Sequence, residues 1–246
     1  MRRWSYLWLT GVVFMSVVGV GQNTKPKSNK AKNPPPAQQV KPVANTVATP
    51  VLSAWDSELL RELNAVRANP PQAVTLLLEF RKYFQGNELH LPKTTPIVTN
   101  EGLAAVDEAI SFLKTAPALP PLQASTAISL AAQDHLKDIL ATGLSGHRGS
   151  DSSLPPQRVQ KRGVNTYNVG ENISYFSQDA RLVIFWMLVD DGNPKRGHRN
   201  NILSNAYKFI GLANGPSKEF GRVCVMVFAD QTAPEGNNKK PVPIKL

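Results

Sequence analysis

The sequence is poor in cysteine, with Cys224 the only one among 246 residues. A chain with one cysteine forms no internal disulfide, so packing and hydrogen bonds must hold the fold together in any compartment. Cys224 lies in "RVCVMVF", a pattern that predicts a β-strand. We therefore expect a buried, apolar thiol there rather than a catalytic nucleophile.

Several signatures of catalysis and of phosphate binding are also missing. The chain contains no G-x-S-x-G, no H-E-x-x-H and no phosphate-binding glycine loop. These absences exclude the nucleophile elbow of serine hydrolases, the helical zinc-protease motif and the P-loop. The serines near His147 suit turns and caps, and Asp151 is expected to be a turn residue rather than a member of a catalytic triad.

Acidic residues are absent from the first 50 positions, which carry seven basic side chains. Residues 51–230 carry 18 basic and 17 acidic side chains, and the tail 231–246 carries three lysines and one glutamate. The net charge of +10 therefore belongs to the two ends and not to the body of the chain. This distribution argues against nucleic-acid binding, which needs basic residues on a folded face. The basic N-terminal segment is either a solvated linker or a weak contact with an anionic surface.

The N-terminus has the pattern of an export signal. Arg2 and Arg3 precede the apolar segment "WSYLWLTGVVFMSVVGVG", which ends in small residues. This pattern predicts a signal peptide over residues 1–21, cleaved after Gly21. A retained membrane anchor is the alternative, because the apolar run is at the short limit for a membrane span, about 17–20 residues. In both cases the remainder of the chain is expected to be secreted or extracytoplasmic.

The remaining chain divides by composition into a linker, a folded domain and a tail. Residues 22–50 are rich in proline and lysine and are expected to be a disordered linker. Residues 51–230 form the predicted domain, and residues 231–246 a basic tail. Helical patterns dominate the first half of the predicted domain. A polar loop over residues 143–170 then precedes a strand, a helix and a β-hairpin. This order predicts an α+β sandwich. The expected helix-end residues are Ser53, Asn100, Gly143, Asp179 and Gly192.

Two of the four histidines stand in a shared local pattern. His147 in "SGHRGS" and His198 in "RGHRNN" each follow glycine and precede arginine, which suits a side chain held in a cleft. Glu171 in "NVGENIS" lies between them in the sequence. These three side chains could bind zinc, or they could only hydrogen-bond the loops together, and both readings stay open. By contrast, His90 is expected at the surface without a partner, and His135 in the core or half-buried.

Three segments resemble the CAP family, which comprises cysteine-rich secretory proteins, antigen 5 and pathogenesis-related 1 and is also known for its SCP domain. They are "LLRELNAVRANP", "SGHRGSDSSLPPQRVQKRGVNTYNVGENISYF" and "VDDGNPKRGHRNNILSNAYKFIGLANG". The resemblance covers residues 56–230 and is strongest to the disulfide-free, exported branch common in bacteria. It implies a three-layer α-β-α sandwich.

The resemblance also implies a site of two histidines and two acids. His147, Glu171 and His198 match three of these positions, and Zn²⁺ or another divalent metal is the implied cofactor. The second acid, which is the fourth residue of the site, usually lies three residues after a tryptophan in the helix before the second histidine, but the residue three positions after Trp186 is Val189. Asp190 and Asp191 follow it as weaker candidates.

Two arginines flank His198 in the segment that follows these aspartates. We expect Arg196 and Arg199 to brace the loop through the aspartates rather than to bind a substrate.

The resemblance implies two functions from different classes. The first is a binding module, expected to act as a monomer, for a lipid, peptide or cell-wall ligand. The second is a metal- or histidine-dependent hydrolase that uses the same three residues. The sequence offers no clear nucleophile, which favours the binding module.

Overall fold

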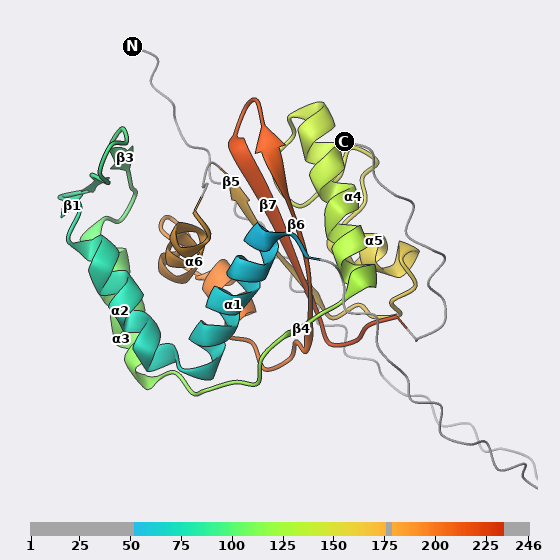
Figure 1. The fold of residues 1–246 in the computed structure, drawn as a ribbon, viewed down its shortest axis with the longest axis horizontal. Helices are drawn as coiled ribbons and strands as arrows, with labels where there is room; N and C mark the ends of the chain where they lie inside the picture. Colours follow the sequence, from blue (N-terminus) through green and yellow to red (C-terminus); the bar gives the residue numbers. More distant parts are fainter. Residues whose placement is uncertain (1–51, 176–178, 234–246) are drawn as a thin grey trace, which may run out of the picture. The chain divides into compact units, whose positions relative to one another are not determined.

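The computed structural model describes residues 52–175 and 179–233, which form a sheet with helices on both faces (Figure 1). This arrangement confirms the predicted α+β class and the α-β-α layers. The helices are α1 (Ala54–Ala68), α2 (Pro70–Arg81), α3 (Leu103–Thr115), α4 (Thr126–Thr142), α5 (Pro155–Lys161), α6 (Ala180–Val189) and α7 (Gly197–Ile202). The strands are β1 (Phe84–Gln85), β2 (Glu88–Leu89), β3 (Ile97–Val98), β4 (Gln123–Ala124), β5 (Val169–Tyr175), β6 (Phe209–Ser217) and β7 (Gly221–Ala229).

The main sheet has the strand order β4-β6-β7-β5. Strands β6 and β7 form the predicted antiparallel hairpin, and β5 pairs antiparallel with β7 so that Glu171 lies opposite Val227. The short strand β4 pairs parallel with β6. Strand β5 is consequently an edge strand, and the elements that carry His147 and His198 flank it.

Alternating side chains of the sheet build two apolar cores, one on each face. Cys224, Met226 and Phe228 pack with α1, α2, α3 and α6, whereas Val225 and Val227 pack with α4 and α5. Cys224 is buried and has no disulfide partner, and burial raises the pKa of its thiol well above the ordinary value. The prediction of an inert, buried thiol is confirmed.

Three of the five expected helix ends are confirmed. The side chain of Ser53 accepts a hydrogen bond from the Asp56 amide at the start of α1. Asp179 caps α6 by accepting from the amides of Arg181 and Leu182. Gly143 ends α4 in the left-handed conformation, with φ of 71°.

The other two helix ends were predicted wrongly. Helix α3 begins at Leu103 after Gly102, and not at a cap formed by Asn100. Asn100 instead donates to the carboxylate of Asp191, a long-range contact that local patterns do not reveal. Helix α6 ends before Gly192, because Asp190 already adopts the left-handed conformation with φ of 52°.

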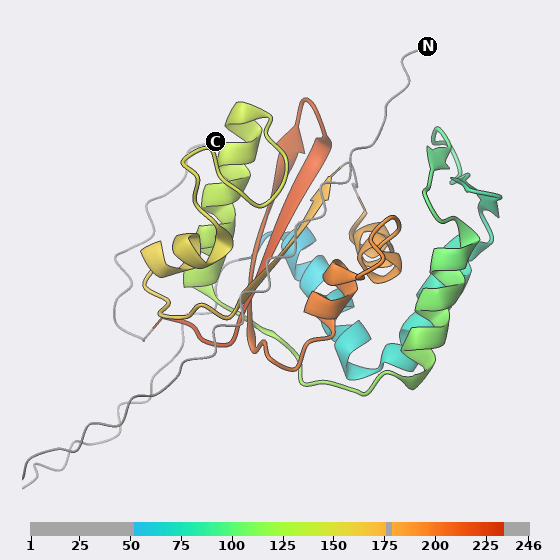
Figure 2. The ribbon, with the colours of Figure 1, turned by 180° about the vertical axis from the view of Figure 1, so that it is seen from behind.

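Two short helices that position the candidate site were not predicted. Helix α5 lies within the expected polar loop and begins with two prolines, which suit the first turn of a helix. Helix α7 follows the charged turn after α6 and is the short orange helix in Figure 2. Both are too short to show a helical hydrophobic period. They carry Arg158 and His198, respectively.

No helix within the described ranges is long and apolar enough to cross a membrane. The predicted signal peptide and linker, and most of the tail, lie outside the described residues.

Candidate functional site

Glu171 on β5 is the centre of a buried ionic network. Its side chain is 1% exposed, and its Oε1 lies 2.9 Å from Nδ1 of His147. Its other oxygen, Oε2, accepts a hydrogen bond of 2.8 Å from Nη2 of Arg158, which is also buried. Both carboxylate oxygens of Glu171 therefore have partners from the protein.

The charge state of Glu171 follows from these partners. Burial alone would raise the pKa of Glu171, but the hydrogen bond to His147 and the charge of Arg158 outweigh it and hold the pKa below its usual range. An ionised carboxylate only accepts hydrogen bonds, so Nδ1 of His147 must be the donor. The neutral imidazole of His147 then carries its free lone pair on Nε2.

Hydrogen bonds hold the backbone of the loop that carries His147. Nη2 of Arg158 donates to the carbonyl of His147 at 3.1 Å. One residue earlier, the amide of Gly146 donates to Oη of Tyr175 at 2.9 Å, and the carbonyl of Gly146 lies 2.8 Å from Nε2 of His135. The His147 ring itself is 17% exposed, so its backbone is held while its outer edge stays accessible.

His135 on α4 supports this loop from within the core. It is 1% exposed, which confirms the expected core histidine, although its Nδ1 has no hydrogen-bond partner in the described part of the chain. Burial lowers the pKa of His135 despite the opposing charge of Glu171, so the ring is neutral. A neutral ring bonded to a carbonyl must donate through Nε2.

His198 belongs to a second pair, with Asp190 and not with Glu171. Its Nδ1 lies 2.6 Å from Oδ1 of Asp190, and its backbone amide donates to Oδ2 of the same carboxylate at 2.8 Å. The left-handed conformation of Asp190 turns the chain at the end of α6 and directs its side chain to α7. The Asp190 side chain is 3% exposed and that of His198 is 16% exposed. Each histidine thus has its own buried carboxylate.

Asp191, the other candidate for the fourth position, has a different role. Its carboxylate accepts hydrogen bonds of 2.7 Å from the backbone amides of Asn100 and Glu101. These contacts join the end of α6 to the segment before α3. The structure therefore separates two neighbouring aspartates that the sequence could not distinguish, and only Asp190 contacts a histidine.

Arg196 and Arg199 brace the turn as expected, but the predicted aspartate partners were wrong. Both terminal nitrogens of Arg196 lie 2.7 Å from the carboxylate of Glu101, and Nη2 of Arg199 lies 2.5 Å from Glu108. The two glutamates are about 90 residues away in the sequence, so no local pattern indicated them. Arg196 contacts Asp190 only through its backbone carbonyl.

The two histidine–carboxylate pairs lie on opposite faces of the edge strand β5. Glu171 shares the face of Val227, which packs with α4 and α5, and the next residue, Asn172, faces the other layer. Nδ2 of Asn172 donates to the carbonyl of His198 at 3.0 Å, and Asn201 of α7 donates to Oδ1 of Asn172 at 2.8 Å. Strand β5 thus connects the two pairs.

His147 and His198 offer a metal two oriented imidazole rings. The described side chains do not form a complete set of metal ligands around them. Among the described residues, no group of three or more histidine, cysteine, aspartate or glutamate side chains could hold a metal ion. A histidine that binds a metal usually donates its other nitrogen to a carboxylate, and His147 and His198 both do so. In this arrangement Glu171 and Asp190 orient the rings. That Glu171 or Asp190 itself binds a metal stays a prediction.

His90 differs from its expectation. Its Nε2 lies 3.0 Å from Oε2 of Glu88, so it has a partner two residues away, and its side chain is 31% exposed. His90 is thus partly exposed, which is near the expected surface position. The expectation that it has no partner was wrong.

The fold and the paired histidines define an α-β-α domain of the CAP class. The model of the CAP family, described as the cysteine-rich secretory protein family, matches residues 60–228. The chain belongs to this family, as its motifs indicated.

Two solved structures are similar over part of the chain. One is an extracellular protein with an SCP domain from Bacillus anthracis str. Ames, with 22% identity, a TM-score of 0.38 and coverage of 45% of this chain and 34% of that chain. The other is an outer surface protein from Borrelia burgdorferi, with 16% identity, a TM-score of 0.38 and coverage of 47% and 80%. The match thus spans about a third of the Bacillus protein. No curated protein matched the sequence.

Proposed function

We propose that this chain is an extracytoplasmic binding module in which His147 and His198 bind a divalent metal such as Zn²⁺ through their Nε2 atoms. The observation that carries the proposal is that a buried carboxylate holds Nδ1 of each ring. This contact fixes the ring orientation and leaves the lone pair of Nε2 for a metal. The extracytoplasmic location rests on the export signal predicted over residues 1–21.

A site with two protein ligands suits binding better than catalysis. Zinc usually has four ligands, so a lipid, peptide or cell-wall ligand, or water, would supply the remaining donors. Both carboxylates are engaged with their histidines, and neither is left as a free base. Only a hydrolase that uses a carboxylate as its general base would need a free one.

The test is a calorimetric titration of the full chain with zinc. We expect binding to the wild type and to the control variant His90→Ala, and loss of binding in the double variant His147→Ala/His198→Ala. Binding should weaken in acidic solution, because protons compete with the metal for the imidazole nitrogens. Circular dichroism would verify that each variant is folded. Equal heats for the wild type and the double variant would refute the proposal.

A further inference from the structure

A second site is centred on Arg67, in the last turn of α1. Arg67 is 1% exposed, one of the largest fully buried side chains in the described part of the molecule. Its Nε donates to the carbonyl of Pro120 at 2.9 Å, and its Nη1 donates to the carbonyls of Ile202 and Ser204 at 2.7 and 2.9 Å. The guanidinium therefore ties α1 to the segment before β4 and to the end of α7.

Among the described residues, this buried cation has no acidic partner. No carboxylate within the described ranges forms an ion pair with Arg67, and burial lowers the pKa of its guanidinium without any opposing contribution from an acid. Other buried arginines differ, because Arg158 contacts Glu171 and Arg199 contacts Glu108. Arginine stays protonated in proteins, so within residues 52–175 and 179–233 this full positive charge faces carbonyl dipoles and no carboxylate. A buried charge without a counter-ion is costly.

One terminal nitrogen of the guanidinium has no hydrogen-bond partner in the described part of the chain. Arg67 has five N–H groups, and its three hydrogen bonds engage Nε and Nη1 but leave both N–H groups of Nη2. Within the described residues, the fully enclosed unpartnered atoms are His135 Nδ1, Arg158 Nε and Arg199 Nε. Nη2 of Arg67 is not among these fully enclosed atoms, and Arg67 contributes to the wall of a pocket.

The pocket lined by Arg67 has a volume of about 280 Å³. Lys208 lines it as a second cation, Gln123 and Asn205 add amide groups, and no acidic residue contributes to its wall. The rings of Tyr207 and Phe209 supply apolar surface. The volume suits a small ligand, and the charges suit an anion.

We propose that this pocket binds a small oxyanion, a phosphate or carboxylate group, held by Nη2 of Arg67 and by the ammonium group of Lys208. The oxyanion supplies the counter-charge that no carboxylate of the described residues provides. This site is separate from the paired histidines and does not depend on a metal.

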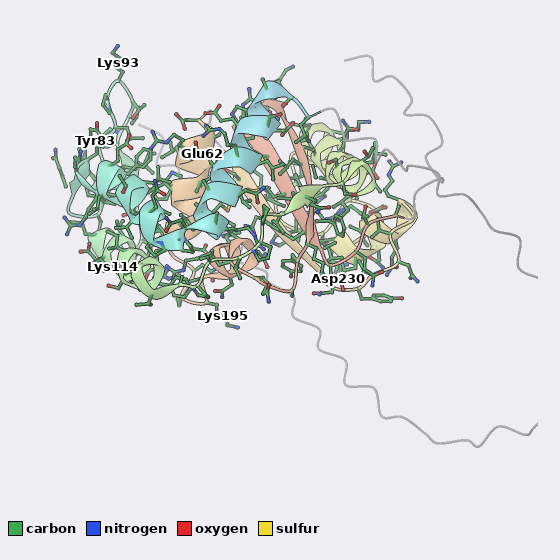
Figure 3. All side chains as sticks on the ribbon, turned by 60° about the horizontal axis from the view of Figure 1, so that its bottom comes forward. Glu62, Tyr83, Lys93, Lys114, Lys195 and Asp230 are labelled. Carbon is green, nitrogen blue, oxygen red and sulfur yellow. The ribbon has the colours of Figure 1, made fainter. Side chains whose placement is uncertain are left out.

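The test is a titration of the full chain with inorganic phosphate at constant ionic strength, followed by NMR amide shifts. We expect saturable shifts at Tyr207 and Lys208 that sodium chloride does not produce. Lys208→Gln should weaken phosphate binding about threefold, the effect of one exposed charge. The matched control is Lys93→Gln, an exposed lysine at the tip of the β2–β3 connection in Figure 3, and it should bind as the wild type does.

Arg67→Lys keeps the positive charge but loses the planar guanidinium, which can donate two parallel hydrogen bonds to one oxyanion. We therefore expect phosphate binding to be about tenfold weaker in the folded variant. Because Arg67 also ties three segments together, its substitution affects folding as well as binding, and Lys208→Gln keeps the test independent of it. The proposal is overturned if phosphate produces no saturable shifts at Tyr207 and Lys208. It is also overturned if Lys208→Gln and Lys93→Gln bind phosphate equally well.

Discussion

At the scale of single residues, the most consequential contact is the buried ion pair between Glu171 and Arg158. It orients His147, because the same carboxylate accepts from Nδ1 of the ring. Removing one member of a buried pair leaves the other as an uncompensated charge, which costs far more than the loss of a surface pair. The pair is therefore important both for stability and for the geometry of the site.

The first prediction compares two arginines at α5. Arg158→Met should lower the free energy of unfolding by about 3–5 kcal/mol, because Glu171 stays buried without its cation. The control Arg162→Met removes an exposed pair with Asp134 and should cost about 0–1 kcal/mol. Urea denaturation of both variants measures the two values. Similar costs for the two substitutions would contradict the assigned role of Arg158.

The second prediction concerns the buried, neutral His135. Burial lowers its pKa in the folded chain, so the unfolded chain binds a proton more readily below about pH 6.5. The contribution of neutral His135 to stability is complete above that pH and is lost as the pH falls below it, by up to about 1.4 kcal/mol per pH unit. In urea denaturation between pH 7 and 5, His135→Gln should show a weaker pH dependence than the wild type. An unchanged slope would contradict this explanation.

The sequence identified most of the residues of the site, but not their partners. His147, Glu171, His198 and Asp190 were all candidates, because glycine-flanked histidines and the family motifs mark them locally. Arg158 was missed, since it lies on a helix hidden in a polar loop. The partners of Arg196 and Arg199 were also missed, because pairing over such distances depends on the fold and not on local sequence.

At the scale of elements, the closest packing is between α4 and β6. A Cβ atom added at Gly211 would lie 2.2 Å from the backbone carbon of Ile128 and 2.3 Å from the amide nitrogen of Ser129. Only glycine allows this approach, because backbone atoms cannot yield as a flexible side chain can. The position of α4 against the sheet, and with it that of His135, depends on this glycine.

The third prediction follows from that approach. Gly211→Ala should destabilise the fold by about 3 kcal/mol or more, at the upper end for overpacked substitutions. The control is Gly215→Ala on the same strand, where the nearest atom, a side-chain carbon of Leu140, would lie at 3.5 Å, an ordinary contact. Thermal unfolding followed by circular dichroism distinguishes the two. Equal melting temperatures would contradict the close packing of α4 on β6.

Long elements were predictable and short ones were not. The apolar face of α4 and the hairpin of β6 and β7 have clear periods in the sequence. Helices α5 and α7 have seven and six residues, and strand β4 has two. Such short segments acquire their conformation mainly from tertiary contacts, such as the hydrogen bonds from Asn172 and Asn201 at α7.

At the scale of the whole molecule, the layered fold places the two histidine–carboxylate pairs on either side of strand β5. His147 belongs to the loop after α4, and His198 to α7 on the other side of β5. The order of elements predicted the layers, but it could not show that each histidine has a separate carboxylate. That distribution is why we propose that the carboxylates orient the rings and that the Nε2 atoms bind the metal.

The most direct test of this assignment is the tautomeric state of the histidines, measured by ¹⁵N NMR of the metal-free chain near pH 8. The account predicts that His147 and His198 carry their proton on Nδ1, donated to Glu171 and Asp190, while His135 carries its proton on Nε2. Protons on Nε2 in His147 and His198 would contradict the account, because the proposed metal-binding nitrogens would then have no free lone pair.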